Sequence, residues 1–100
     1  MIDDARQRRE FIRYVVLLAL YNAHPVGAWE EVIVNTVQGV YADATKHEVR
    51  REIDYLFDRK LIKVTKHPYG RWFGEINRHG IDVIERTVEC EPGIALPPKP

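Results

Sequence analysis

Hydrophobic residues recur at helical spacing near the start of the chain. From Asp3 or Asp4 to about Asn22 the pattern predicts a long first helix, with acids in the first turn, where the helix dipole favours them. From Tyr14 to Tyr21 this helix is apolar on every side, which indicates burial on every side. A second subunit could cover the face that turns away from the core. Alternatively, the rest of the chain, including its last helix, could wrap around it.

A second helix is predicted from Trp29 to about Gln38. Its apolar face is made of Trp29, Val32, Ile33 and Val37. Gly39 suits the left-handed position just past the helix end. The many β-branched residues leave a strand conceivable for this segment.

A third helix is predicted to start after Thr45. Thr45 and Glu48 have the spacing of a capping box, in which each side chain satisfies a backbone N–H at the helix start. The apolar stripe consists of Val49, Ile53, Leu56 and Phe57. Two helices joined by the short turn at residues 40–44 are typical of a helix-turn-helix, with this third helix as the reader.

The next segment predicts a two-stranded hairpin. Residues Leu61 to Lys66 alternate between apolar and polar, as in a half-buried strand. The sequence HPYGR carries turn chemistry, because Pro68 fixes φ and Gly70 permits a positive φ. Trp72 to Ile76 then forms the return strand, where Trp72 and Phe73 pack under the hairpin or stack on bases.

Asn77 is expected to cap a last helix in which Gly80 is tolerated. The apolar residues of that helix are Ile81, Val83, Ile84 and Val88. Residues 91–100 include four prolines and form a tail that is disordered or lies extended across a surface. The fold class is therefore α+β, mainly α, with one domain over residues 1–90.

Composition fits one small globular domain, with 100 residues of which 45% are hydrophobic and 30% charged. The single Cys90 excludes an intramolecular disulfide and a multi-cysteine zinc site, and it favours a reducing cytoplasm. No signal peptide is evident. The apolar run Tyr14 to Tyr21 is far shorter than the ~20 residues that span a bilayer, so no membrane association is expected.

Charge is segregated along the chain although its formal sum is zero. Between Lys46 and Arg78 there are nine Lys or Arg residues against five acids. A neutral sum counts against a protein that coats nucleic acid indiscriminately. A cationic helix followed by a hairpin with a cationic tip favours duplex DNA as the partner.

The order of helix, helix, helix, strand, turn, strand and helix resembles the winged helix-turn-helix family. The specific likeness lies in HEVRREIDYLFDRKLIKVTKHPYGRWFGEINRHGIDVIE. The segment INRHGIDVIE resembles the "L-T-x-x-G-x-x-x-x-E" entry into the final helix of MarR-like and PadR-like regulators, with Ile76 and Asn77 in place of leucine and threonine. The resemblance covers roughly residues 5–88. The size and the proline-rich tail are similar to small winged-helix proteins of Mu-like prophages.

The resemblance implies a transcriptional regulator that binds double-stranded DNA as a homodimer through its N-terminal helix. The residues that would enter the major groove from the third helix are Lys46, His47, Arg50 and Arg51. The hairpin, or wing, would meet phosphates or the minor groove with Lys63, Lys66, His67 and Arg71.

A second interpretation is a protein-interaction adaptor, as in phage or complex assembly. Arg50 and Arg51 have helical neighbour spacing to Asp54 and Asp58, and such surface ion pairs also occur in helices without a ligand. The tail sequence IALPPKP could dock into a groove of a partner protein.

Enzymatic chemistry is not expected. The histidines at positions 24, 47, 67 and 79 lack ligand-like spacing, so we expect no metal. Neither a nucleophile–base order nor a glycine-rich loop after a strand is present, and we expect no cofactor.

Overall fold

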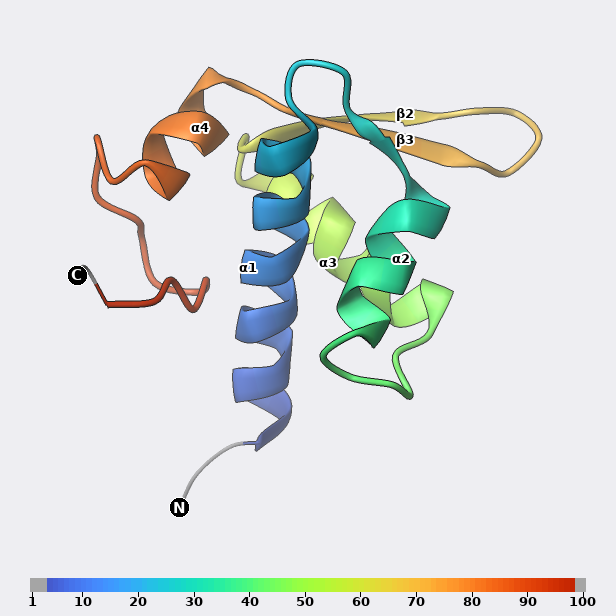
Figure 1. The fold of residues 1–100 in the computed structure, drawn as a ribbon, viewed down its shortest axis with the longest axis horizontal. Coiled ribbons are helices and arrows are strands. Elements are labelled where there is room, and N and C mark those ends of the chain that lie inside the picture. Colours follow the sequence, from blue (N-terminus) through green and yellow to red (C-terminus); the bar gives the residue numbers. More distant parts are fainter. Residues whose placement is uncertain (1–3, 99–100) are drawn as a thin grey trace.

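The computed structural model describes residues 4–98 and forms an α+β fold. Helix α1 (Asp4–Ala23) stands at the centre, with α2 (Glu30–Gln38) and α3 (Lys46–Asp58) on one side and α4 (Arg78–Ile84) on the other (Figure 1). Strands β2 (Ile62–Lys66) and β3 (Trp72–Ile76) form a hairpin that projects beyond the helices. Short β1 (Ala28–Trp29) completes an antiparallel sheet of order β1-β3-β2.

The bounds of α1 agree with the predicted first helix, although Asp3 lies outside the described residues. Its core face holds Ile12, Val15, Val16, Leu17 and Leu20. The helix contacts α2, α3, β3 and α4, so the chain itself covers most of the apolar segment. Tyr14 and Leu18 remain half-buried. This arrangement agrees with the second of the two predicted ways to bury the helix.

Three details of the segment around α2 differ from the prediction. Trp29 belongs to β1, where it pairs with Phe73 of β3. The sequence did not predict this strand, because two residues are too few to show a periodic pattern. Gly39 ends α2 with a right-handed φ of −65°, so the predicted left-handed position is wrong. Val32 is 54% exposed, whereas Ile33 and Val37 are buried in the core and Val34 packs against it.

Helix α4 begins as predicted, since the Asn77 side chain accepts a hydrogen bond from the Gly80 N–H at 2.9 Å. It ends earlier than the apolar pattern indicated, and Val88 lies beyond it and is exposed. Gly80 is required rather than merely tolerated. A Cβ there would lie 2.2 Å from the backbone oxygen of Leu61.

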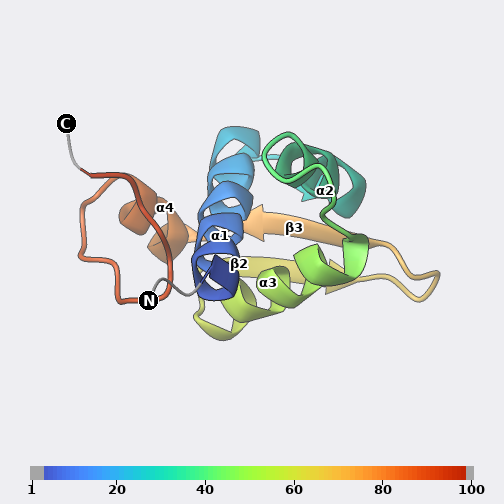
Figure 2. The same ribbon diagram turned by 90° about the horizontal axis from the view of Figure 1, so that it is seen from below.

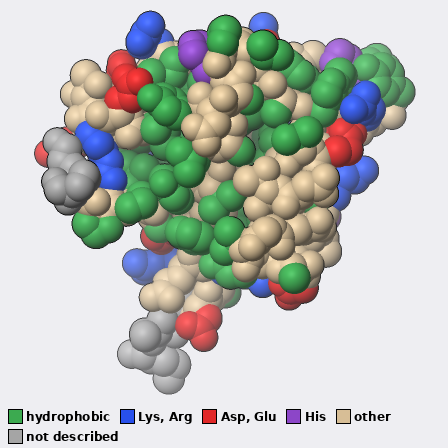
Figure 3. All heavy atoms as spheres, viewed as in Figure 1, with side chains coloured by type: hydrophobic (Ala, Val, Ile, Leu, Met, Phe, Trp, Pro, Cys, Tyr) green, Lys and Arg blue, Asp and Glu red, His purple; other side chains and the backbone are tan. Residues whose placement is uncertain are grey.

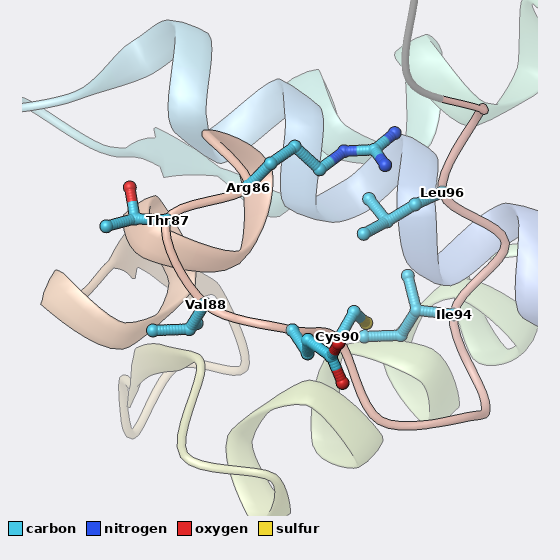
Figure 4. A pocket seen from close by; sticks show the side chains of 7 residues that line it. Arg86, Thr87, Val88, Cys90, Ile94 and Leu96 are labelled. Atoms are coloured by element: carbon cyan, nitrogen blue, oxygen red, sulfur yellow. The ribbon is translucent and has the colours of Figure 1, made fainter.

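The described part of the C-terminal segment, residues 91–98, lies against the body of the domain and turns at residues 92–94. Arg13 donates to the backbone oxygen of Gly93, Arg59 to that of Pro92, and Arg86 to that of Pro97. Ile94 is buried in the core. Figure 4 shows the hollow of about 440 Å³ beneath this segment, with Ile94, Leu96 and Cys90 along its wall. Pro100 falls outside the described residues.

Within residues 4–98, none of the helices combines the length and the apolar character needed to cross a lipid bilayer.

Candidate nucleic-acid interface

Helix α3 starts where the sequence predicted. The Thr45 side chain accepts a hydrogen bond from the Glu48 N–H at 3.1 Å, which is one half of the capping box. The Glu48 carboxylate accepts two hydrogen bonds from Arg8 of α1, at 2.8 and 2.9 Å. The N-terminus of α3 is therefore fixed against α1 as well as capped.

The apolar stripe of α3 is confirmed for Val49, Ile53 and Leu56, which are buried. Phe57 was predicted as its fourth member, but it is 50% exposed. Glu52 is buried in addition, and its Oε1 accepts a hydrogen bond from Arg13 of α1 at 2.8 Å. Glu52 thus occupies the buried face of α3, while Phe57 lies toward solvent beside β2.

The hairpin has a tight, defined tip. The His67 N–H donates to the Arg71 oxygen at 2.9 Å, and the Gly70 N–H donates to the His67 oxygen at 2.9 Å. Gly70 has a φ of +88°, as the turn sequence predicted. The tip projects past the N-terminal end of α3 (Figure 2).

Arg50 connects α3 to the hairpin and to the start of α2. Its guanidinium donates two hydrogen bonds to the Glu30 carboxylate, at 2.6 and 2.5 Å, and a third to the backbone oxygen of Gly70. It also lies 4.5 Å from the centre of the Trp72 ring. Glu30 is only 2% exposed, and its carboxylate raises the pKa of Arg50. The predicted base reader is thus engaged in an internal ion pair.

Arg71 makes a second such connection on the outer side of the hairpin. It donates two hydrogen bonds to Glu31, at 2.8 and 3.2 Å, and lies 3.9 Å from the centre of the Trp29 ring. These bonds lower the pKa of Glu31. The His67 ring lies between Trp29 and Tyr69, with centroid distances of 5.3 and 5.2 Å. This stack stiffens the tip.

The remaining predicted cations fall into two groups. Lys66 pairs with Asp54 at 3.0 Å, Lys63 with Glu75 at 3.9 Å, and Arg51 with Glu52 at 3.5 Å. Lys46 and His47 are exposed at the first turn of α3, and neither has an ion pair within residues 4–98. The sequence spacing allowed Arg50 and Arg51 to pair with Asp54 and Asp58. In the structure Arg50 pairs with Glu30, and Arg51 pairs with Glu52.

The predicted aromatic residues of the return strand pack within the hairpin. Trp72 is half-buried between Arg50 and Lys66, and Phe73 lies 5.0 Å from Trp29. A shallow hollow of about 320 Å³ separates α3 from β3, and it is lined by His47, Arg50, Arg51, Asp54 and Trp72.

Sequence reasoning missed the roles of Glu30 and Glu31. They precede their arginine partners by 20 and 40 residues, and no local spacing rule relates positions that far apart. The only signal was two adjacent acids at the start of a helix.

The structure thus brings together cations from α3 and the hairpin, with acids among them. Among the predicted contact residues, Lys46 and His47 are exposed and take no part in an ion pair within residues 4–98. Exposed ion pairs such as Lys66–Asp54 are worth about 0–1 kcal/mol, so a phosphate can replace the carboxylate at small cost. The buried Arg50–Glu30 pair is different, because releasing Arg50 would leave a buried carboxylate unpaired.

Residues 4–98 contain no cluster of three or more His, Cys, Asp or Glu side chains that could hold a metal ion. Comparison of the sequence with models of known protein families and with curated proteins finds no match.

Proposed function

We propose that this chain is a winged-helix domain that binds duplex DNA through α3 and the β2–β3 hairpin and acts as a transcriptional regulator. The proposal is supported by the order of the four helices and the β2–β3 hairpin along the chain, to which the structure adds the short strand β1. The observation that carries the proposal is the three-way contact of Arg50 with Glu30, Gly70 and Trp72. This contact fixes the spacing between the exposed cations of the helix and those of the hairpin.

In this proposal the eight predicted residues have different tasks. Lys46, His47 and Arg51 contact DNA from α3, while Lys63 and Lys66 contact phosphate from the hairpin. The tasks of Arg50, Arg71 and His67 are to orient the hairpin. Most of the binding energy would come from phosphate contacts, so affinity should fall steeply with salt.

Dimerisation through α1 belongs to the same proposal. Figure 3 shows hydrophobic side chains gathered over the middle of the molecule, on the face that contains α1, with charged side chains toward the periphery. A two-fold axis at this face would present two copies of α3 to successive turns of the duplex.

A second candidate is a protein-interaction adaptor on the same fold. The specific observation in its favour is that Glu31, Asp54 and Glu75 neutralise three hairpin cations. A surface with both signs of charge suits a protein partner better than it suits a polyanion.

Two charge reversals at equivalent positions separate these candidates. Lys46 and Arg78 are each the first residue of a helix and each exposed, so Lys46→Glu and Arg78→Glu change net charge equally. We expect Lys46→Glu to weaken binding of a labelled duplex about tenfold, or about 1.4 kcal/mol, and Arg78→Glu to have little effect. Equal effects of the two variants, or no salt-dependent DNA binding at all, would favour the adaptor.

A further inference from the structure

Strand β2 is an edge of the sheet. Its one partner within residues 4–98 is β3, because the strand order is β1-β3-β2. An edge strand presents backbone N–H and C=O groups that can pair with another extended chain.

The register shows which residues of β2 present those groups. Asn77 donates to the Leu61 oxygen at one end of the hairpin, and His67 donates to the Arg71 oxygen at the other. Hydrogen-bonded and non-hydrogen-bonded pairs alternate between these ends, so Lys63 and Thr65 direct their backbone groups toward β3. The residues whose backbone groups point away from β3 are therefore Ile62, Val64 and Lys66.

An apolar hollow accompanies this open edge. Phe57 of α3 and Val64 and Lys66 of β2 line a space of about 280 Å³. Phe57 is 50% exposed, although it stands on a helix whose other large apolar residues face the core. A side chain opposite Val64 on an added strand would lie on the same face of the sheet and could cover Phe57.

Charge and shape select the occupant. Lys63 is 71% exposed, and its nearest acid, Glu75, is 3.9 Å away, whereas Lys66 is already paired with Asp54 at 3.0 Å. Two lysine-bearing edges disfavour pairing with each other. A second copy would also bring its own α3 toward this one, and helices need about 8–10 Å between axes while paired strands lie about 4.8 Å apart. Figure 2 shows that α3 lies against β2.

We propose that the open edge of β2 binds an extended segment of another protein as an added strand. The segment carries an apolar residue opposite Val64 and an acidic residue opposite Lys63. Backbone hydrogen bonds to Val64 and Lys66 supply affinity, because Ile62 is itself buried, and the Phe57 hollow and Lys63 supply specificity. The proposed DNA contact also uses Lys63 and Lys66, so the two proposals share these residues but rest on different observations.

Amide hydrogen exchange of the full chain, followed by NMR, tests the proposal. The probe is a blocked heptapeptide of alternating Glu and Val, and its control is the same peptide with Lys in place of Glu. With the acidic peptide at ten times its Kd, we expect the amides of Val64 and Lys66 to exchange about tenfold more slowly. The amides of Lys63 and Thr65 should be unchanged, because they already bond to β3.

Variants check which atoms are responsible. Val64→Pro removes an N–H that points away from β3, so it should abolish binding and keep the hairpin. If Val64→Pro does not fold, Phe57→Ser serves instead, with Val32→Ser on α2 as an equally exposed apolar control. We expect Phe57→Ser to weaken peptide binding several-fold and Val32→Ser to leave it unchanged.

Four results would overturn the proposal. The first is equal protection by the lysine peptide, and the second is protection only at amides other than those of Val64 and Lys66. The third is concentration-dependent protection without peptide, which would indicate a second copy, and the fourth is the same protection produced by duplex DNA. Loss of DNA binding in Lys46→Glu has no bearing on these readouts, so the two proposals can fail separately.

Discussion

At the scale of single residues, the pair of Arg50 and Glu30 distinguishes this molecule from a simple cationic helix. A charged carboxylate that is 2% exposed is stable only because a guanidinium meets it in a two-bond geometry. The same guanidinium reaches the tip of the hairpin at Gly70. One arginine therefore balances a buried charge and sets the position of a functional element.

Removing Arg50 should destabilise the fold rather than only weaken ligand binding. We expect Arg50→Ala to lower the free energy of unfolding by roughly 2–4 kcal/mol, since it leaves Glu30 buried without a partner. The control Arg78→Ala removes an exposed arginine at the first position of α4 and should change the free energy of unfolding by less than about 0.5 kcal/mol. Urea denaturation measures both. Similar small losses in the two variants would contradict the role given to Arg50.

The Glu31–Arg71 pair makes stability depend on pH. Because Arg71 lowers the pKa of Glu31 in the folded state, the pair stabilises the fold above the ordinary glutamate pKa. This contribution is lost as the pH falls through the lowered folded value. In an NMR titration, Arg71→Gln should return the Glu31 carboxyl pKa toward its ordinary value. An unchanged pKa in that variant would show that Arg71 is not the cause.

At the scale of elements, local signals predicted most of the fold. Thr45 and Asn77 cap their helices as expected, and the return strand has the predicted bounds of Trp72 to Ile76. Each of these signals lies within a few residues of the feature it determines. The burial predicted for Phe57 and Val32 was wrong, since both side chains are exposed. Helical spacing shows that an apolar stripe exists, but it does not show which edge of the stripe faces the core.

The candidate site was less predictable than the elements. The sequence placed cations on the third helix and on the hairpin, and the structure puts both on neighbouring elements. Apart from Glu52, which directly follows Arg51, their acidic partners lie 12 to 40 residues away in the chain, as for Lys66 with Asp54 and Arg71 with Glu31. Such partners are determined by tertiary packing, so composition revealed the cations but not their neutralisation.

Two glycines should respond differently to alanine. Gly70 has a φ of +88° and open space around it, so Gly70→Ala should cost only backbone strain, about 1–2 kcal/mol. Gly80 has no such φ, but an added Cβ would lie 2.2 Å from the Leu61 oxygen, so Gly80→Ala should cost more. Thermal unfolding compares them. A larger loss for Gly70→Ala would contradict the close packing of α4 on the hairpin base.

At the scale of the whole molecule, the formal net charge is zero although the proposed ligand, DNA, is a polyanion. The reconciliation lies in the distribution of charge, because Lys46 and His47 remain exposed while most other cations of α3 and the hairpin are paired. Binding of this kind would be modest for one copy. A dimer with two reading helices would raise it through effective concentration.

Dimerisation is the next expectation at this scale. Light scattering should give twice the mass of one chain, and Leu18→Glu, on the half-buried part of α1, should give a monomer that still folds. Glu31→Lys, on the exposed start of α2, is the control and should remain dimeric. If the wild-type chain is monomeric at high concentration, α1 is not a subunit interface.

The most direct measurement is an NMR footprint of the full chain with a short DNA duplex at low salt. The account predicts that amide shifts cluster at Lys46, His47 and Arg51 of α3 and at Lys66 to Tyr69 of the hairpin, and that they fade as salt is added. The amide signals of α4 and of the C-terminal segment should not shift. Shifts confined to those elements, or none at all, would contradict the claim that α3 and the hairpin form one DNA-contacting surface.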